Sequence, residues 1–217
     1  MIEIKILYED DNIVVVNKPE GLASIHDNAG ENEDLHTTLS NRLNQKVLVV
    51  HRLDKEVSGV IIYAKNESAH KELNKQFAER RVNKTYLALV HGEVRKDRGK
   101  INKPIREFGS GRMGVDDNNG KPSKTVYETI KRFPSFTLLE LNPDTGRRHQ
   151  LRVHLYYIGH PIVGDLRYGE KSFQENFPRL MLHAKSLTVT IKGNELTFTA
   201  ELPGSFSKCL QTIDKGF

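Results

Sequence analysis

The sequence predicts an α+β protein, with a mostly antiparallel mixed sheet and flanking helices in a single domain over residues 1–217. Segments with strand character outnumber those with helical character, and they do not alternate in the regular strand–helix–strand order of a parallel sheet. No repeat of about 20 to 50 residues recurs along the chain. The 217 residues are enough for one sizeable core and would be crowded as two full domains.

The first part of the chain predicts strands around one helix. A β-branched run over 13–16 ends in Asn, Lys, Pro, Glu and Gly, which is typical of a strand followed by a turn, and the alternating residues before it supply a pairing strand. The next expected elements are a helix over 36–45, a short buried strand over 47–50 and a strand over 57–64. The charged tetrapeptide His51–Asp54 therefore lies in a loop between apolar segments, where a rigid sheet would hold it in place.

The middle and the end of the chain predict an amphipathic helix and several hairpins. Leu73, Phe77 and Ala78 recur among charged residues over 68–80, so the basic side of that helix should be exposed. Residues 106–124 are rich in Gly, Asn, Asp and Lys, and they predict a mobile loop or a long hairpin. The other expected elements are a strand over 86–90, a hairpin of 124–133 with 136–141 that turns at Pro134 and Ser135, and a hairpin over 187–202 that turns at Gly193 and Asn194.

A further helix is expected over 147–158. Three apolar residues recur at the spacing of one helical face, namely Leu151, Leu155 and Ile158. Asp144 or Thr145 can cap the start of this helix, and Gly159 can end it.

Positive charge is concentrated in two places. The net charge is +5, yet the stretch from Lys71 to Arg106 alone holds eleven Lys and Arg residues against four Asp and Glu residues. Arg148 and Arg152 are four residues apart, so they should share a face near the positive end of the helix dipole and attract a phosphate or a carboxylate. A charge run taken alone favours a solvated helix face with a charged loop. A concentrated basic surface is also what a polyanion requires, and nucleic acid is therefore a hypothesis at this point.

Several other classes of protein and site are excluded. A single cysteine, Cys209, can form neither an internal disulfide nor a thiolate metal site. His149 and His154 are five residues apart and no HExxH motif occurs, so no metal is expected. The GxGxxG match at 109–114 is not a dinucleotide site, because no strand–helix–strand unit surrounds it and the residues after it cannot form a helix. No apolar run is long enough to cross a membrane and the N-terminus is unlike a signal peptide, so a cytoplasmic protein is expected.

Two segments resemble the motifs of a known family. HRLDKEVSG at 51–59 and TGRRHQLRVHL at 145–155 closely resemble the HRLD-x-x-(T/S)-SG and GR-T-HQ-(I/L)-RVHL motifs of the RluA-type pseudouridine synthases. Further landmarks follow in the order of the family: VVVNKPEGLASI at 14–25, KTY at 84–86, GKPSKT at 120–125, HPIVGD at 160–165 and LHA at 182–184. The resemblance covers about residues 7 to 204. It implies the pseudouridine synthase catalytic fold, an RNA substrate and no cofactor.

The resemblance also implies a role for each site residue. The reaction breaks the N1 glycosidic bond of uridine and joins C5 to the same ribose carbon, and Asp54 is the nucleophile that adds at C1′ or at C6 of the ring. Arg152 stabilises and orients that carboxylate, while Tyr86 stacks on the base and is the candidate to remove the C5 proton. Arg52 fills the space that the flipped uridine leaves. The residues expected to contact RNA are Arg52, His51, Arg80, Arg81, Lys84, Arg147 and Arg148.

Two departures from the family pattern and two alternatives accompany this interpretation. Val57 and Arg148 stand where the family usually has threonine. The chain begins directly with the catalytic domain, so we expect the form without the N-terminal S4-like domain, as a monomer that acts on ribosomal RNA, transfer RNA or both. The first alternative is an RNA-binding protein that assists RNA folding without catalysis, and the intact Asp54, Tyr86 and Arg152 argue against it. The second is a retaining glycosidase, and the absence of tryptophan argues against it.

Overall fold

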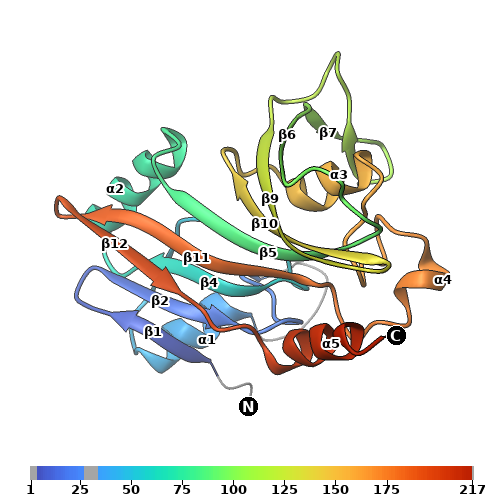
Figure 1. Cartoon of the computed structure of the whole chain (residues 1–217). Coiled ribbons are helices and arrows are strands. Elements are labelled where there is room, and N and C mark those ends of the chain that lie inside the picture. Colours follow the sequence, from blue (N-terminus) through green and yellow to red (C-terminus); the bar gives the residue numbers. More distant parts are fainter. Residues whose placement is uncertain (1–3, 27–33, 217) are drawn as a thin grey trace. The chain divides into compact units, whose positions relative to one another are not determined.

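The chain forms two compact units. The structure is a computed structural model that describes residues 4–26 and 34–216 (Figure 1). Unit 1 comprises residues up to 84 together with 183–203, and unit 2 comprises 85–182 together with the segment from 204 onward. Both units are built from strands and helices, and most strand pairs in each are antiparallel, which confirms the predicted α+β class.

Unit 1 holds a sheet that carries the HRLD loop. Its strands are β1 (Lys5–Glu9), β2 (Ile13–Lys18), β3 (Leu48–Val49), β4 (Ser58–Ala64), β11 (Leu182–Ile191, whose first residue belongs to unit 2) and β12 (Asn194–Thr199). β2 pairs antiparallel with both β1 and β4, β3 pairs antiparallel with β4, and β12 pairs antiparallel with β11. The exception is the parallel pair of β4 with β11, in which Ser58 lies opposite His183 and Gly59 opposite Ala184. This pair places the residues that follow the HRLD loop beside the LHA segment.

The core of unit 1 lies between this sheet and helix α2 (Glu67–Ala78). Ala69 and Leu73 of the helix pack with buried residues of β4 and β11, such as Val60 and Val189. Asn66 caps the helix, because its side chain accepts a hydrogen bond from the backbone N–H of Ala69 at 2.9 Å. Helix α1 (Leu35–Arg42) is capped in the same way by the Asp34 side chain, which accepts from the Thr37 N–H.

Unit 2 holds a second group of antiparallel strands. They are β5 (Asn83–His91, whose first two residues belong to unit 1), β6 (Arg98–Asn102), β9 (Lys124–Phe133) and β10 (Phe136–Pro143), paired in the order β5-β10-β9-β6. A separate hairpin, β7 (Ile105–Glu107) with β8 (Met113–Val115), packs on helix α3 (Gln150–Tyr157) through Ile105, Val153 and Tyr168 (Figure 1). The remaining helices of this unit are α4 (Lys171–Gln174) and α5 (Gly204–Asp214).

Most of the expected elements are confirmed, and three are corrected. Helix α3 begins at Gln150 and not at 147, and neither Asp144 nor Thr145 caps it, because His149 has a positive φ of 54° that no α-helix can include. The last hairpin turns at Lys192 and Gly193 rather than at Gly193 and Asn194, since these two residues have the positive φ values of a tight hairpin turn. The strand expected over 47–50 is only the two residues of β3.

Residues 106–124 form a short hairpin only up to Val115, through β7 and β8, and the residues from 116 to 123 form turns and an isolated bridge to Ile105. No helix follows the GxGxxG match. Within 4–26 and 34–216, none of the helices has the length and apolar character needed to cross a membrane.

Candidate active site

The loop that carries Asp54 is anchored by a buried lysine. Lys18, at the end of β2, is fully buried, and its ammonium donates to the carbonyl oxygens of Pro19, Leu22 and Lys55 at 2.9, 2.7 and 3.0 Å. A buried charge needs such polar partners to offset its lost hydration. The Gly21 N–H also donates to the Lys55 carbonyl. The NKPEG turn and the residue after Asp54 are thus tied to one buried charge.

A buried serine holds the other side of the same loop. The Ser24 hydroxyl donates to the Leu53 carbonyl at 2.8 Å and accepts from the Leu53 N–H at 3.1 Å. The hydroxyl of Tyr63, on β4, donates to the Ser24 carbonyl at 2.7 Å. Leu53 is buried, whereas the Asp54 side chain that follows is partly exposed, and the Asp54 carbonyl accepts from Val57 N–H in a tight turn. The backbone on both sides of Asp54 is therefore fixed by contacts that do not use its carboxylate.

The segment after the loop is joined to β11 by a buried serine–histidine pair. Ser58 Oγ lies 2.8 Å from His183 Nδ1, and His183 Nε2 lies 3.2 Å from the carbonyl oxygen of Ala200. A carbonyl can only accept, so Nε2 carries a proton and donates to Ala200. The His183 ring thus joins β4 to the Ala200 backbone through two buried hydrogen bonds. The sequence marked the LHA segment as a landmark, but it contained no signal for this pairing across 125 positions.

Gly59 is required where β4 meets β11, and its replacement is expected to be costly. Its φ is +117°, and a Cβ on it would overlap the Ala184 backbone. We expect Gly59→Ala to lower the free energy of unfolding by roughly 3 kcal/mol, from strain and steric overlap together. Gly21→Ala is the matched control, because Gly21 also has a positive φ but a Cβ on it would meet nothing within 4 Å. It should cost only about 1 kcal/mol. Equal losses for both variants in urea denaturation would contradict the close approach.

His51 faces the protein interior. Its Nε2 accepts from the Ile62 N–H at 3.2 Å, and its ring stacks on Phe77 with the centroids 4.8 Å apart. Burial, together with the nearby Lys84, lowers the pKa of His51 to about 3, so the ring is neutral at physiological pH. These contacts explain why a histidine opens the HRLD loop: it ties the loop to β4 and α2. A neutral ring offers no charge to a phosphate, and the predicted RNA contact of His51 stays a prediction.

The other basic residues predicted to bind RNA in unit 1 lie at or near the surface. Arg52 and Arg80 are exposed, and Arg80 has a positive φ of 58° just after the end of α2. Arg81 is exposed and pairs with Glu79 at 2.6 Å, an ion pair that contributes little to stability in water. Lys84 is half-buried beside His51. None of these placements tests the predicted contact with RNA.

In unit 2, Gln150 ties the GRRHQ segment to strand β9. Its Oε1 accepts from the Thr145 hydroxyl at 2.6 Å and from the Arg147 N–H at 3.1 Å. Its Nε2 donates to the Lys124 carbonyl at 2.9 Å and to the Thr125 hydroxyl at 3.1 Å. One amide thus satisfies four groups, which explains why the chain turns sharply before the helix can start.

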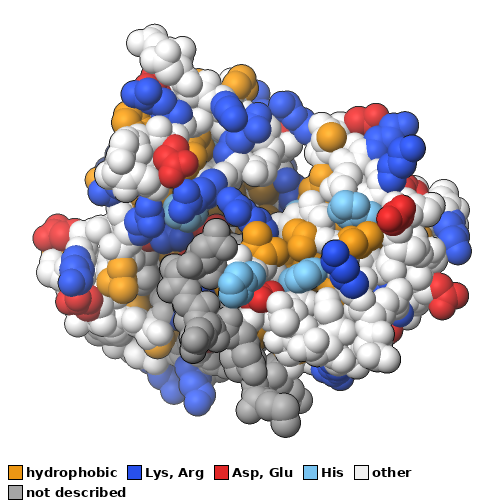
Figure 2. Space-filling model, turned by 180° about the vertical axis from the view of Figure 1, so that it is seen from behind, with side chains coloured by type: hydrophobic (Ala, Val, Ile, Leu, Met, Phe, Trp, Pro, Cys, Tyr) orange, Lys and Arg blue, Asp and Glu red, His pale blue; other side chains and the backbone are white. Residues whose placement is uncertain are grey.

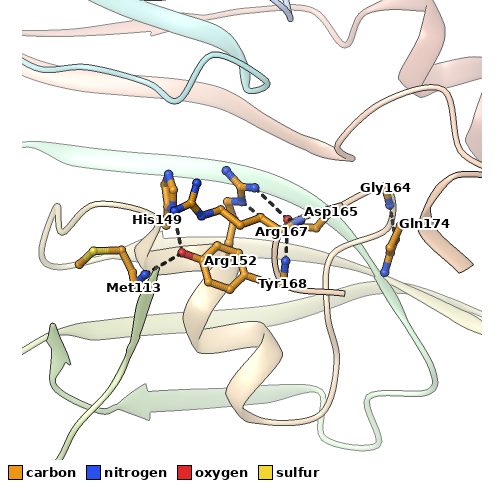
Figure 3. Close-up of polar contacts among 8 residues, drawn as sticks. All are labelled: Met113, His149, Arg152, Gly164, Asp165, Arg167, Tyr168 and Gln174. Carbon is orange, nitrogen blue, oxygen red and sulfur yellow. Dashed lines mark hydrogen bonds and ion pairs between the residues drawn. The ribbon is translucent and has the colours of Figure 1, made fainter. Parts of the chain in front are cut away.

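Arg152 is held by a buried carboxylate (Figure 3). Its Nε and Nη2 donate to Asp165 Oδ2 and Oδ1, each at 2.8 Å, and the two residues are only 4% and 1% exposed. Asp165 Oδ1 also accepts the backbone N–H groups of Arg167 and Tyr168 at 3.0 and 3.1 Å. A bidentate, charge-assisted pair of this kind fixes the plane of the guanidinium. Asp165 was missed as a site residue, although it ends the HPIVGD segment that the family resemblance marked.

The prediction that Arg148 and Arg152 share one helical face is wrong. Arg148 precedes the helix, is exposed, and pairs with Glu107 at 3.1 Å, while Arg152 is buried. Helical spacing does not apply across the left-handed His149. Arg147 lies partly buried just before the helix, and its Nε is buried without a hydrogen-bond partner among the residues that the structure describes. Such a donor is costly unless a ligand oxygen accepts from it.

Tyr86 lies on β5, half-buried, opposite Leu141 of β10. Asp54 belongs to unit 1, and Tyr86 and Arg152 belong to unit 2. In the described part of the chain no three His, Cys, Asp or Glu side chains are grouped as metal ligands, and the expected absence of a metal stays a prediction.

Comparison with known proteins identifies similar chains. The model of the family described as RNA pseudouridylate synthase matches residues 12–157. The chain is 42% identical over 200 residues to the dual-specificity RNA pseudouridine synthase RluA of Escherichia coli strain K12, covering 90% of this chain and 91% of that protein. It is 37% identical over 217 residues to the ribosomal large subunit pseudouridine synthase C of Vibrio vulnificus, covering 96% and 69%. Among solved structures, human RNA pseudouridylate synthase domain containing 4 superposes with a TM-score of 0.82 at 28% identity, covering 97% and 93%.

Proposed function

This chain belongs to the family of RNA pseudouridylate synthases, isomerases that convert uridine to pseudouridine in RNA, and we propose that Asp54, Tyr86 and Arg152 carry out that reaction. The names of the matched relatives are those of synthases, which supports catalysis over an RNA-binding protein without activity. The match over 12–157 includes parts of both units, so we propose that the two units act as one catalytic domain.

The observation that carries the assignment is the anchoring of the backbone around Asp54. Lys18 and Ser24 hold its neighbours through buried hydrogen bonds, so the carboxylate is presented on a rigid loop while remaining partly exposed. A nucleophile benefits from such preorganisation, because little entropy is lost in reaching the attacking geometry.

The reaction needs no redox partner and no energy input. The Asp54 carboxylate either adds at C1′ and displaces N1, or adds at C6 before the C1′–N1 bond breaks. The base then turns and C5 bonds to C1′. The bond between Asp54 and the substrate breaks as well, by displacement from C1′ or by elimination from C6, and the free carboxylate is regenerated. C5 then loses its proton and N1 gains one, so the product is an isomer of the substrate. Tyr86 is assigned to stack on the uracil and to accept the C5 proton.

Arg152 is assigned to keep Asp54 ionised and oriented. The bidentate contact with Asp165 sets the plane of its guanidinium, and a fixed guanidinium can direct its donors at a second carboxylate. The basis for pairing it with Asp54 is the family motif, in which the arginine of RVHL occupies this position.

Ribosomal RNA, transfer RNA or both are the proposed substrates, since the names of the relatives include a large-subunit ribosomal synthase and a dual-specificity synthase. Arg52, Arg80, Arg81, Lys84, Arg147 and Arg148 are the proposed phosphate and base contacts, and the buried Nε of Arg147 supports its inclusion. A monomer and a cytoplasmic location remain predictions.

Tritium release from C5 tests the proposed function. Ribosomal RNA and transfer RNA transcripts, each labelled with 5-tritiated uridine, should release tritium to water when incubated with the protein. The two pools are assayed separately, so the class of RNA that reacts is read directly. Binding to either pool without release would favour the RNA-binding alternative, and free uracil in the supernatant would indicate a glycosidase.

A further inference from the structure

We propose that unit 2 carries a second RNA contact outside the proposed catalytic residues, a tyrosine strip formed by Tyr156, Tyr157, Lys103 and Arg112, which binds an unpaired stretch of the substrate by stacking. The inference rests on the proposed function in one respect, that the substrate is RNA. Tyr156 and Tyr157, at the end of α3, are 49% and 48% exposed. Lys103 Nζ lies 5.3 Å from the centre of the Tyr157 ring, and Arg112 Cζ lies 5.7 Å from that of Tyr156.

The core of unit 2 does not require these two rings. The buried apolar residues of α3 are Leu151, Val153 and Leu155, and Tyr156 and Tyr157 come after them with about half of their surface in water. Single exposed apolar residues are ordinary on protein surfaces, but two adjacent aromatic rings that each have a cation above them are not explained by packing. Aromatic rings beside basic groups are the usual means of binding unpaired nucleotides, since every base has a face that stacks.

The strip is continuous with the surroundings of Arg152. Tyr168 is only 2% exposed, and its ring centre lies 5.3 Å from the Cζ atoms of both Arg152 and Arg112. The Tyr156 ring is 6.4 Å from the Tyr168 ring, centre to centre. One buried ring therefore separates the proposed catalytic arginine from the strip. A strand whose target uridine reaches Arg152 would place neighbouring nucleotides near Tyr156 and Tyr157.

Among the described residues, three basic side chains in or near the strip are already paired with carboxylates, and Arg112 is not. Lys103 pairs with Asp117 at 3.0 Å, Arg106 with Asp116 at 2.6 Å and Arg148 with Glu107 at 3.1 Å. Arg112 has no carboxylate partner among the described residues, so its guanidinium can move from the rings to a phosphate without breaking an ion pair. Figure 2 shows Lys and Arg side chains interspersed with Asp and Glu side chains on one face of the protein. The strip thus offers two exposed rings for stacking and one cation, Arg112, for a phosphate, which are the groups that bind single-stranded RNA.

Substitution of both tyrosines tests the strip. The substrate is a stem-loop that contains the reactive uridine with unpaired flanking nucleotides, compared with a version whose flanks are paired. Tyr156→Ala with Tyr157→Ala should raise KM for the unpaired version by roughly 10- to 100-fold, because stacking is lost, and should leave kcat within about twofold. The matched variant with Phe at both positions keeps the rings and should retain the wild-type KM. The paired version should show the same KM for all three proteins.

A second variant tests the strip while both tyrosines stay in place. Arg112→Gln should lower the slope of log affinity against log salt by about 0.7, the value for one single-strand phosphate contact. An unchanged slope together with an equal KM for wild-type, Ala and Phe proteins would overturn the strip while leaving the function intact. A loss of kcat in the Ala variant, or a KM change that does not depend on the flanks, would also overturn it, since either result would indicate a structural role. Failure of the wild-type protein to modify any RNA would instead contradict the proposed function.

Discussion

Asp54→Asn is expected to abolish turnover and to leave the fold and RNA affinity close to those of the wild type. The amide has the shape of the carboxylate but lacks its nucleophilicity, so the rate should fall by roughly 10⁴-fold or more, as when other enzymes lose a nucleophile. The fold should survive, because the contacts of Lys18 and Ser24 with this loop use backbone groups and not the Asp54 side chain. Single-turnover tritium release and RNA binding, measured on the same preparation, separate the two effects.

Asp11→Asn is the matched control for the charge change. Asp11 is exposed in the turn between β1 and β2, in the same unit, and is not assigned to the site. It should react at the wild-type rate. Multiple turnover by an Asp54→Asn preparation free of wild-type enzyme would show that another group is the nucleophile.

Arg152→Ala is expected to impair both stability and activity. It leaves Asp165 as a buried carboxylate without its guanidinium, which should cost about 3–5 kcal/mol in the free energy of unfolding. Tritium release should also fall severely, because in the proposed mechanism Asp54 loses the cation that keeps it ionised and oriented. Both quantities are measured on the same variant.

A double substitution distinguishes the catalytic role of Arg152 from its structural one. Arg152→Met with Asp165→Asn removes both buried charges, so much of the lost stability should return. Activity should not return, since no guanidinium is present. If activity recovered together with stability, Arg152 would be needed only for folding, and the carboxylate of Asp54 would have a different partner.

The local parts of the fold were predicted well from the sequence. The β-branched run at Ile13 and the apolar segment at 57–64 became β2 and β4, and the amphipathic pattern around Leu73 became α2. Such elements depend on the spacing of apolar residues over a few positions. The start of α3 was predicted wrongly because the Gln150 side chain decides where the chain turns. Its partner Thr125 is 25 positions away in the sequence.

The family, the reaction and the position of Asp54 in a loop between two strands could all be inferred from the amino-acid sequence alone, since they depend on residue types in a fixed order. The groups that hold the site became visible only in three dimensions. Lys18 binds the loop, Ser58 meets His183, and Asp165 pairs with Arg152. Each of these contacts joins residues between 13 and 125 positions apart by directional hydrogen bonds in a dry interior, and no pattern along the chain records which polar groups the packing of strands and helices will bring within 3 Å of one another.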